Sequence, residues 1–321
     1  MPTIPVIDLA GPQRDVVDAI VDACGRLGFL IVVGHGLDPA VEDAAWDNAR
    51  AFFDLPLEEK MRSAMPSPGY PYGYAPFGAE RLSASLGAVA APDLKQTISI
   101  GPVDPQRTSS GEALENWARL PTIWPANPAG LRPAWEAFYR AMADLAARLM
   151  RLFAIGLDLA ADHFDPLIDE HVSALRFLDY PRQVALPEPG QLRAGPHTDY
   201  GTLTILRQEQ RPGGLEIADR DGSWLPVDHV AGSYVVNLGD AMARWTNDRW
   251  RSTLHRVVNP PTNADGESRR QSIAFFHNAN WDAEIECIAS CLEPGEAPRY
   301  EPVRAGAHLM AKFQRTGSTP T

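Results

Sequence analysis

The stretch GPHTDYGTLTIL, residues 195–206, is the part of the sequence that most strongly indicates the fold. Its second half is rich in Thr, Leu and Ile, the β-branched and apolar residues that favour a strand. Side chains two positions apart on a strand lie on the same face. We therefore expect His197 and Asp199 to point to one side, where they can meet one metal ion, and Thr198 to the other. Alone, however, a His-x-Asp pair is far more often a hydrogen-bonded pair or a surface feature.

A second histidine strengthens the prediction of a metal site. His255 follows Asp199 by 56 residues, in another β-branched run, STLHRVV. Two histidines and one carboxylate on one face of a metal suit iron(II), because the opposite face keeps positions for co-substrate and O2. A closed zinc site with four protein ligands would not leave that room. A catalytic zinc can use the same three ligands, so the ligands alone leave the metal open.

Arg270-Gln271-Ser272 opens a further strand-like run, SIAFF, 15 residues after His255. Arg270 and Ser272 are again two positions apart and are expected on one face of the strand. Arginine presents a planar fork of donors that matches a carboxylate, and the serine hydroxyl adds one donor. The pair could therefore anchor a carboxylate beside the metal. The alternative is a surface arginine that caps a loop.

Composition limits the possible classes of protein. With 45% hydrophobic and 22% charged residues among 321, the chain is in the globular range and long enough to bury a substantial core. Its formal net charge of −12 repels phosphate backbones, and no run rich in Lys and Arg compensates locally. We therefore expect a small-molecule substrate and no nucleic-acid partner.

The N-terminus and the cysteines indicate the cytoplasm. The start, MPTIPVIDLAG, lacks a basic segment followed by an apolar one, and no stretch is long enough to span a membrane. Three cysteines are too few for a disulfide framework and fit a reducing compartment. Cys287 and Cys291 have a spacing that occurs in zinc sites, but no second pair lies nearby, so we expect small buried residues there.

Periodicity predicts the remaining elements. Helices are expected over 12–27, 39–53, 131–155 and 306–313, a strand over 29–33, and a hairpin between 215–218 and 224–227 around Asp221-Gly222. Residues 173 to 288 should form a β-rich core. The segment 66–92, which contains Tyr70, Tyr72 and Tyr74, is expected to be a long loop with aromatic faces and a candidate lid.

The order H-T-D, distal His, R-x-S resembles the isopenicillin N synthase-like family of 2-oxoglutarate and iron(II)-dependent oxygenases. The resemblance spans nearly the whole chain. Besides residues 195–206 it includes GFLIVVGHGL (28–37), FFDLPLEEKMR (52–62), WRSTLHRVVNP (250–260) and HLMAKFQRT (308–316). No single segment is specific, but the combination is.

The resemblance implies a mainly β fold with flanking helices. Its core would be a double-stranded β-helix (jelly roll) in residues 116–321, including the scaffold helix 131–155 and the C-terminal helix. An N-terminal oxygenase region, residues 1–115, would pack on this core with helices, first strands and the lid loop. The implied iron(II) ligands are His197, Asp199 and His255.

The resemblance also implies 2-oxoglutarate as co-substrate, O2 as oxidant and ascorbate as an optional reductant, with Arg270 and Ser272 as anchors of 2-oxoglutarate. Plant members often read Arg-x-Asn-x-Tyr-Pro before the H-x-D motif, whereas this chain reads RFLDYP, residues 176–181. Tyr180 is therefore carried over as a contact of 2-oxoglutarate, but Leu178 stands where the asparagine would be. The implied reaction oxidises a small organic metabolite and releases succinate and CO2. Hydroxylation is expected first, with desaturation or cyclisation as other outcomes.

Two alternatives remain at this point. One is an iron(II) oxidase of the same family that does not use 2-oxoglutarate, and the other is a non-catalytic jelly-roll protein that binds a small molecule. The sequence does not identify the substrate, and a monomer is the expected state. Several further residues stay outside the predicted site. They are His35, His229, His277 and His308, expected to be structural or exposed, and Asn237 and Trp245, which could line the cavity.

Overall fold

The computed structural model describes residues 3–87, 91–103, 117–261 and 268–315. The predicted boundary between 115 and 116 lies outside these residues, so the division into 1–115 and 116–321 stays a prediction. Across the described ranges, no helix combines the length and the apolar character needed to cross a membrane.

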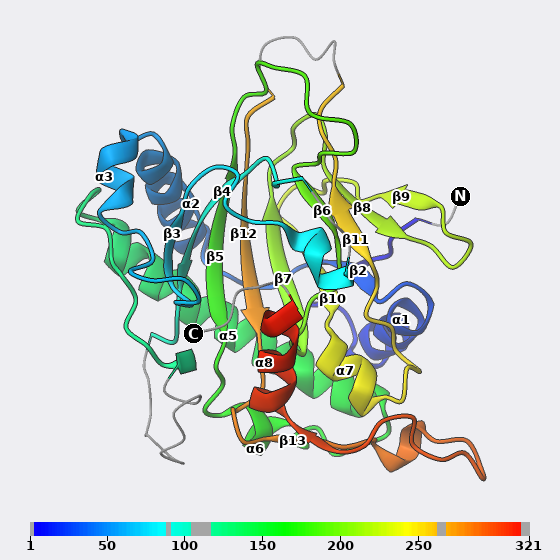
Figure 1. The fold of residues 1–321 in the computed structure, drawn as a ribbon. Helices are drawn as coiled ribbons and strands as arrows, with labels where there is room; N and C mark the ends of the chain where they lie inside the picture. Colours follow the sequence, from blue (N-terminus) through cyan, green and yellow to red (C-terminus); the bar gives the residue numbers. More distant parts are fainter. Residues whose placement is uncertain (1–2, 88–90, 104–116, 262–267, 316–321) are drawn as a thin grey trace.

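An eight-stranded sheet and a four-stranded sheet form the double-stranded β-helix, as predicted (Figure 1). All neighbouring strands pair antiparallel except β1 and β2. The large sheet has the order β1 (Val6–Asp8), β2 (Phe29–Val33), β10 (Tyr234–Leu238), β7 (Leu203–Gln208), β12 (Arg270–His277), β5 (Ala174–Tyr180), β4 (Gln96–Ile100) and β3 (Gly73–Ala75). The small sheet has the order β6 (Ala194–His197), β11 (His255–Val257), β8 (Leu215–Ala218) and β9 (Trp224–Pro226), and β13 (Glu284–Ile285) pairs with β14 (Val303–Arg304).

Helices flank the sheets, as predicted. They are α1 (Gln13–Arg26), α2 (Pro39–Phe53), α3 (Leu57–Met61), α5 (Leu131–Gly156), α6 (Asp165–Ile168), α7 (Asp240–Trp245) and α8 (Ala305–Arg315), with short 3-10 helices η1 (Leu82–Leu86) and η2 (Ala289–Cys291). The predicted helices correspond to α1, α2, α5 and α8, the predicted strand to β2, and the Asp221-Gly222 hairpin to β8 and β9.

The scaffold helix α5 covers the outer face of the large sheet. Its apolar residues recur every three or four positions and are buried, so one stripe faces the sheet. Trp135 in this stripe stacks on Phe177 of β5, with ring centres 3.8 Å apart. Burying a ring of this size contributes roughly 1.5 to 3 kcal/mol, so the stripe fixes the helix to the sheet.

The segment 66–92 differs from its prediction as one long loop. It contains β3 and η1, and residues 88–90 lie outside the described part. Tyr74 pairs with Ile98 across β3 and β4, so its ring points into the outer core, where it packs on Phe52. Tyr72 is also buried. These two tyrosines therefore do not form an exposed aromatic cover; the lid itself stays a prediction.

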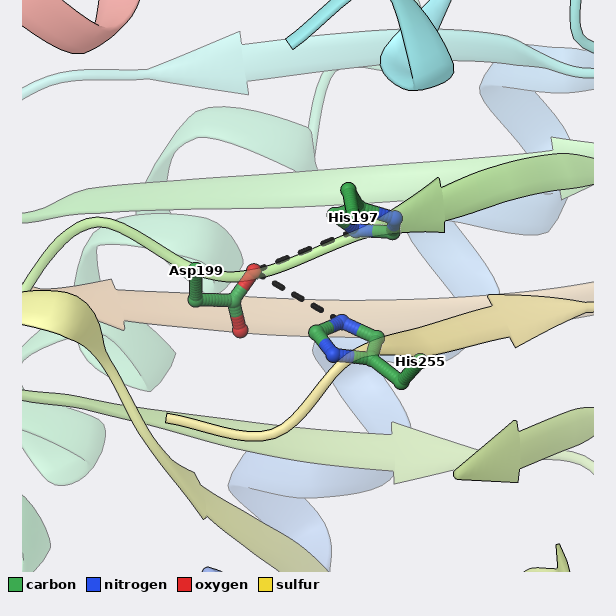
Figure 2. Close-up of side chains that lie close together, drawn as sticks. All are labelled: His197, Asp199 and His255. Atoms are coloured by element: carbon green, nitrogen blue, oxygen red, sulfur yellow. Dashed lines mark ion pairs between the residues drawn. The ribbon is translucent and has the colours of Figure 1, made fainter. Parts of the chain in front are cut away.

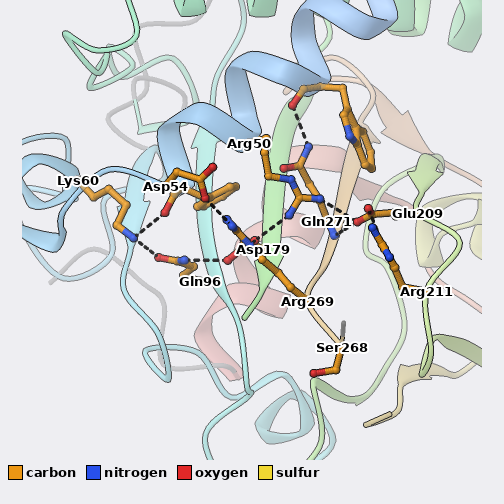
Figure 3. A network of polar contacts seen from close by, with 12 residues as sticks. Arg50, Asp54, Lys60, Gln96, Asp179, Glu209, Arg211, Ser268, Arg269 and Gln271 are labelled. Atoms are coloured by element: carbon orange, nitrogen blue, oxygen red, sulfur yellow. Dashed lines mark hydrogen bonds and ion pairs between the residues drawn. The ribbon is translucent and has the colours of Figure 1, made fainter. Parts of the chain in front are cut away.

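A polar network lies on the outer face, where α2 meets β5 and the start of β12 (Figure 3). Asp179 is 1% exposed. Its carboxylate accepts hydrogen bonds from Arg269 Nε at 2.7 Å and Gln96 Nε2 at 2.9 Å, and it lies 3.6 Å from Arg50 Nη1. Because side chains alternate along a strand, holding Asp179 and Arg269 outside turns Tyr180 and Arg270 to the inner face.

Asp179→Asn should lower the free energy of unfolding by about 2 kcal/mol. Removing one partner of a fully buried ion pair costs roughly 3 to 5 kcal/mol, and the partial exposure of Arg50 and Arg269 reduces this value. Urea unfolding followed by circular dichroism measures the change. Asp18→Asn is the matched control, because Asp18 pairs with Arg14 on the surface. Equal stability of the two variants would contradict the prediction.

Candidate metal centre

Two paired strands bring the two histidines together. His197 ends β6 and His255 begins β11, and the two residues are partners across the strand pair. Asp199 Oδ1 lies 3.9 Å from His197 Nε2 and 3.7 Å from His255 Nε2 (Figure 2). One potential ligand atom from each residue lies within 4.8 Å of the other two. A single metal ion can therefore contact all three side chains.

Hydrogen bonds to the backbone prepare both imidazoles as ligands. Nδ1 of His197 lies 2.8 Å from the carbonyl oxygen of Gly195, and Nδ1 of His255 lies 3.0 Å from that of Thr253. A carbonyl oxygen only accepts, so each Nδ1 carries the proton and each Nε2 keeps its lone pair. Both lone pairs are on the side of Asp199.

Asp199 reaches the histidines from a loop, which corrects the expectation that it continues the strand of His197. Strand β6 ends at His197, and the carbonyl of Asp199 accepts from the backbone N–H of Asp240, the first residue of α7. Its carboxylate is held from β7 and β10. Oδ2 accepts from Thr204 Oγ1 at 2.6 Å and from Asn237 Nδ2 at 2.7 Å, which leaves Oδ1 for the histidines.

The electrostatics of the cluster favour the protonation states that a divalent metal needs. Burial, reinforced by His255, lowers the pKa of His197 to about 3, so this imidazole is neutral near pH 7. Burial alone would raise the pKa of the Asp199 carboxyl, but the neighbouring His255 and the hydrogen bonds from Asn237 and Thr204 outweigh it and lower the pKa below its usual value. A neutral imidazole and an ionised carboxylate are the forms that bind metal.

Arg270 is a buried cation on the inner face of β12, 4% exposed. Its guanidinium donates to the carbonyl of Gly213 at 3.0 Å and to Gln208 Oε1 at 2.7 Å. Within the described part of the chain, its Nε has no hydrogen-bond partner and the guanidinium forms no ion pair with a carboxylate. A buried charge with only neutral partners is costly, so the residues present fit the carboxylate of a bound anion.

The other two predicted anchors share this inner face. Tyr180 lies opposite Arg270 in the pairing of β5 with β12, and Ser272 lies opposite Leu178. All are buried. Leu178 belongs to a small apolar cluster with Tyr180 and Ala274. The leucine thus contributes an apolar wall where an asparagine would contribute a polar group.

Sequence reasoning missed several supporting residues. Thr204 lies within residues 195–206 and donates to Asp199 Oδ2. Its position on a predicted strand was the only sign of this role. Asn237, considered only as a cavity residue, bonds Asp199 instead. Asp93 Oδ1 accepts from the N–H of Gly195, which bonds His197. No local pattern marks Asp93.

Three of the histidines left outside the predicted site, and the tryptophan, form hydrogen bonds that give them structural roles. His277 Nδ1 lies 2.6 Å from Thr202 Oγ1, His35 bonds Gly232 and Leu37, and His308 bonds the carbonyl of Tyr200. Trp245 is buried and donates to the carbonyl of Glu284. Cys287 and Cys291 are free thiols, outside the metal-ligating cluster found among the described residues.

Comparison with known proteins gives two family matches. A model described as the 2OG-Fe(II) oxygenase superfamily matches residues 170–279, and one described as the N-terminal part of a non-haem dioxygenase in morphine synthesis matches residues 4–127. A 2-oxoglutarate-Fe(II) type oxidoreductase of Emericella nidulans is 33% identical over 95% of this chain and 85% of its own. A homoarginine-6-hydroxylase of Oryza sativa subsp. japonica is 31% identical over 92% of this chain and 88% of its own.

Solved structures agree with these matches. A full-length protein of Neurospora crassa, solved in complex with alpha-KG, has a TM-score of 0.84 and 32% identity, over 98% of this chain and 96% of that chain. The same protein has also been solved with alpha-KG and thymine. This structure has a TM-score of 0.82 and 31% identity, over 97% of this chain and 96% of that chain.

Asn237→Ala should weaken iron(II) affinity by about 10- to 100-fold, the usual effect of removing a group that orients a metal ligand. The reason is that Asp199 would lose one of the two hydrogen bonds that hold its Oδ2. Anaerobic titration of the metal-free protein with iron(II) measures the affinity. Asn48→Ala on α2 is the control, because among the described residues this side chain donates a hydrogen bond only to the carbonyl of Ala44. Unchanged affinity in the Asn237 variant would exclude this role.

Proposed function

The chain belongs to the 2OG-Fe(II) oxygenase superfamily, and on this basis we propose that its cluster of two histidines and one carboxylate binds the iron(II). The membership confirms the predicted family and the predicted use of iron(II) and 2-oxoglutarate. The observation that supports the assignment is the approach of three ligand atoms to within 4.8 Å of one another. The proposed ligands are His197, Asp199 and His255.

We propose that Arg270, Ser272 and Tyr180 hold 2-oxoglutarate. The support is the Arg270 guanidinium, which is buried, unpaired with any described carboxylate and keeps a free Nε donor. A carboxylate placed against it would complete the hydrogen bonds of this group. Gln208 and Gly213 fix the plane of the guanidinium before any ligand arrives, so little ordering is needed on binding.

Iron(II), when bound, supplies the oxidising chemistry of the family, in which O2 oxidises a small organic molecule while 2-oxoglutarate becomes succinate and CO2. The chain's own contribution is orientation and exclusion of water. The three ligands occupy one side of the metal position, which leaves the other side for small molecules. Arg270 fixes one end of the co-substrate, and the apolar cluster around Leu178 keeps the space beside it dry.

We propose hydroxylation as the outcome. The Oryza relative is named a hydroxylase, and hydroxylation requires nothing of the protein beyond holding one carbon near the metal. Production of succinate separates this reaction from that of an oxidase without 2-oxoglutarate, and consumption of O2 separates it from a binding protein. The predicted cytoplasmic location is supported by three free cysteines, and gel filtration would test the predicted monomer.

The first experiment adds iron(II) and then 2-oxoglutarate to the metal-free protein without oxygen. A weak visible charge-transfer band of the chelated keto acid is expected. His255→Ala should bind no iron and show no band, because one of three ligands is lost. His163→Ala, which removes an exposed histidine, should keep the band. A full band in the His255 variant would overturn the ligand assignment.

Arg270→Gln should weaken 2-oxoglutarate binding by roughly 10- to 150-fold, the equivalent of one charge-assisted hydrogen bond of about 1.5 to 3 kcal/mol. Iron(II) affinity should change little, because Arg270 is not among the proposed metal ligands. Titration of the same band gives the dissociation constant. Arg132→Gln, on the exposed side of α5, is the matched control. Unchanged co-substrate affinity in the Arg270 variant would rule out the anchor.

A further inference from the structure

A cavity outside the metal centre is lined by residues of α7, α8 and the segment that leads into β11. Figure 1 locates these elements. Its volume is about 660 Å³. Arg244 and Asp240 line it from α7, Lys312 from α8, and Arg251 from the segment before β11. None of the three proposed metal ligands lines this cleft, so it is a separate place on the molecule.

The cleft is cationic although the chain as a whole is acidic. Four formal cations and two carboxylates line it, which leaves an excess of two positive charges against a net charge of −12 for the chain. His308 also lines the cleft, but burial, with Lys312 beside it, lowers its pKa to about 4 and keeps it neutral near pH 7. The cations are Arg220, Arg244, Arg251 and Lys312.

Both carboxylates of the cleft already have partners. Asp240 Oδ2 lies 2.5 Å from Lys312 Nζ and accepts from Thr198 Oγ1 at 3.2 Å. Asp248 Oδ2 accepts from the Tyr300 hydroxyl at 2.8 Å and lies 3.5 Å from an Arg299 nitrogen. Of the four cations, Lys312 is therefore neutralised and the three arginines are not.

Among the described residues, the side chains of the three arginines donate hydrogen bonds only to backbone carbonyls. Arg220 donates to the carbonyl of Gly25, Arg244 to that of Glu301 and Arg251 to that of Arg26. Within the described ranges none of the three forms an ion pair with a carboxylate. Arginine is over-represented where a carboxylate or phosphate is bound through its fork of donors. Arg244 also lies over the Tyr300 ring, with its guanidinium carbon 4.6 Å from the ring centre, a contact that leaves its edge donors available.

Unused donors lie in the same cleft. Arg244 Nε and Ser252 Oγ are buried and have no hydrogen-bond partner among the described residues. Buried polar atoms are nearly always satisfied, so each such atom indicates a missing partner. Burial, and then Arg220, lower the pKa of Arg251, although Asp219 opposes this. Arg220 and Arg251 therefore repel each other, and an anion bound beside them would reduce that repulsion.

We propose that this cleft binds a small multiply charged anion, recognised through phosphate-type or carboxylate groups by Arg220, Arg244 and Arg251. Ser252 supplies a neutral donor to the same ligand. The proposal does not rest on the assignments at the metal centre, because no residue is shared between the two sites.

The cleft nevertheless adjoins both segments that carry the proposed metal ligands. Thr198, between His197 and Asp199, donates to Asp240 of the cleft. Ser252 precedes His255 by three residues. An anion in the cleft would thus be held within a few residues of the ligand-bearing loop.

The test uses sulfate as a probe for phosphate-type groups and glutarate as a probe for paired carboxylates. Isothermal titration calorimetry is carried out on protein loaded with iron(II) and saturated with 2-oxoglutarate under anaerobic conditions, so that the co-substrate site is filled. At least one probe should bind with a stoichiometry near one, and the visible band of the bound keto acid should persist. Tighter binding of sulfate would indicate a ligand with phosphate-type groups, and tighter binding of glutarate would indicate a ligand with paired carboxylates.

Arg244→Gln and Arg251→Gln should each raise the dissociation constant of the bound probe at least 10-fold. Arg251→Lys, which keeps the charge, should retain part of the affinity, and Arg132→Gln should bind like the unaltered protein. The thermal midpoint of each variant without probe shows that it is folded. Binding of neither probe, binding that survives both glutamine variants, or displacement of the keto acid band by the probe would overturn the proposal.

Discussion

The alternation of side chains along β5 and β12 is the constraint on which the rest of the structure depends. Odd-numbered residues such as Phe177, Asp179 and Ile273 face the outer layer, where α5 and the polar network hold them. The residues between them must then face inward. Tyr180 and Arg270 therefore meet inside the β-helix as a consequence of contacts made outside it. A shift of one residue in this pairing would turn the apolar side chains of β5 and β12 away from α5. The same shift would turn Arg270 out of the β-helix.

The metal centre depends on a different device, because its three side chains come from separate parts of the chain. The pairing of β6 with β11 aligns the histidines, but the carboxylate lies beyond the strand and needs its own support. Thr204 and Asn237 provide it from two neighbouring strands of the other sheet. Asp199 thus links the two sheets at the point where the metal would bind. Its orientation is set by the protein before any ion arrives.

Local features of the sequence were enough to predict α5, α1, β2 and the Asp221-Gly222 hairpin, because each depends on periodicity or turn chemistry within a short stretch. Where long-range pairing decides, the predictions were incomplete. Tyr74 is buried because β3 joins β4, which a segment rich in glycine does not reveal. Asp199 lies beyond the end of β6, and its carbonyl accepts from the N–H of Asp240 in α7, a long-range contact that no local pattern shows. Arg244 and Arg251 share a cleft while Arg249, only two residues before Arg251, bonds Ser290 instead, and no periodicity could separate them.

The distribution of charge gives these features a common consequence. An acidic surface repels small anions in general, so unpaired arginines in concave places become the points where anions concentrate. Arg270 is such a point inside the β-helix, and the three arginines at α7 and α8 form another outside it. Burial makes Arg270 bind a carboxylate strongly and selectively, because a desolvated guanidinium gains most from an opposite charge. The three outer arginines are more exposed to solvent than Arg270, so their attraction for an anion should fall faster with salt. A chain that must hold a dianionic co-substrate beside a metal, and whose net charge opposes that, therefore relies on burial rather than on overall charge to capture it.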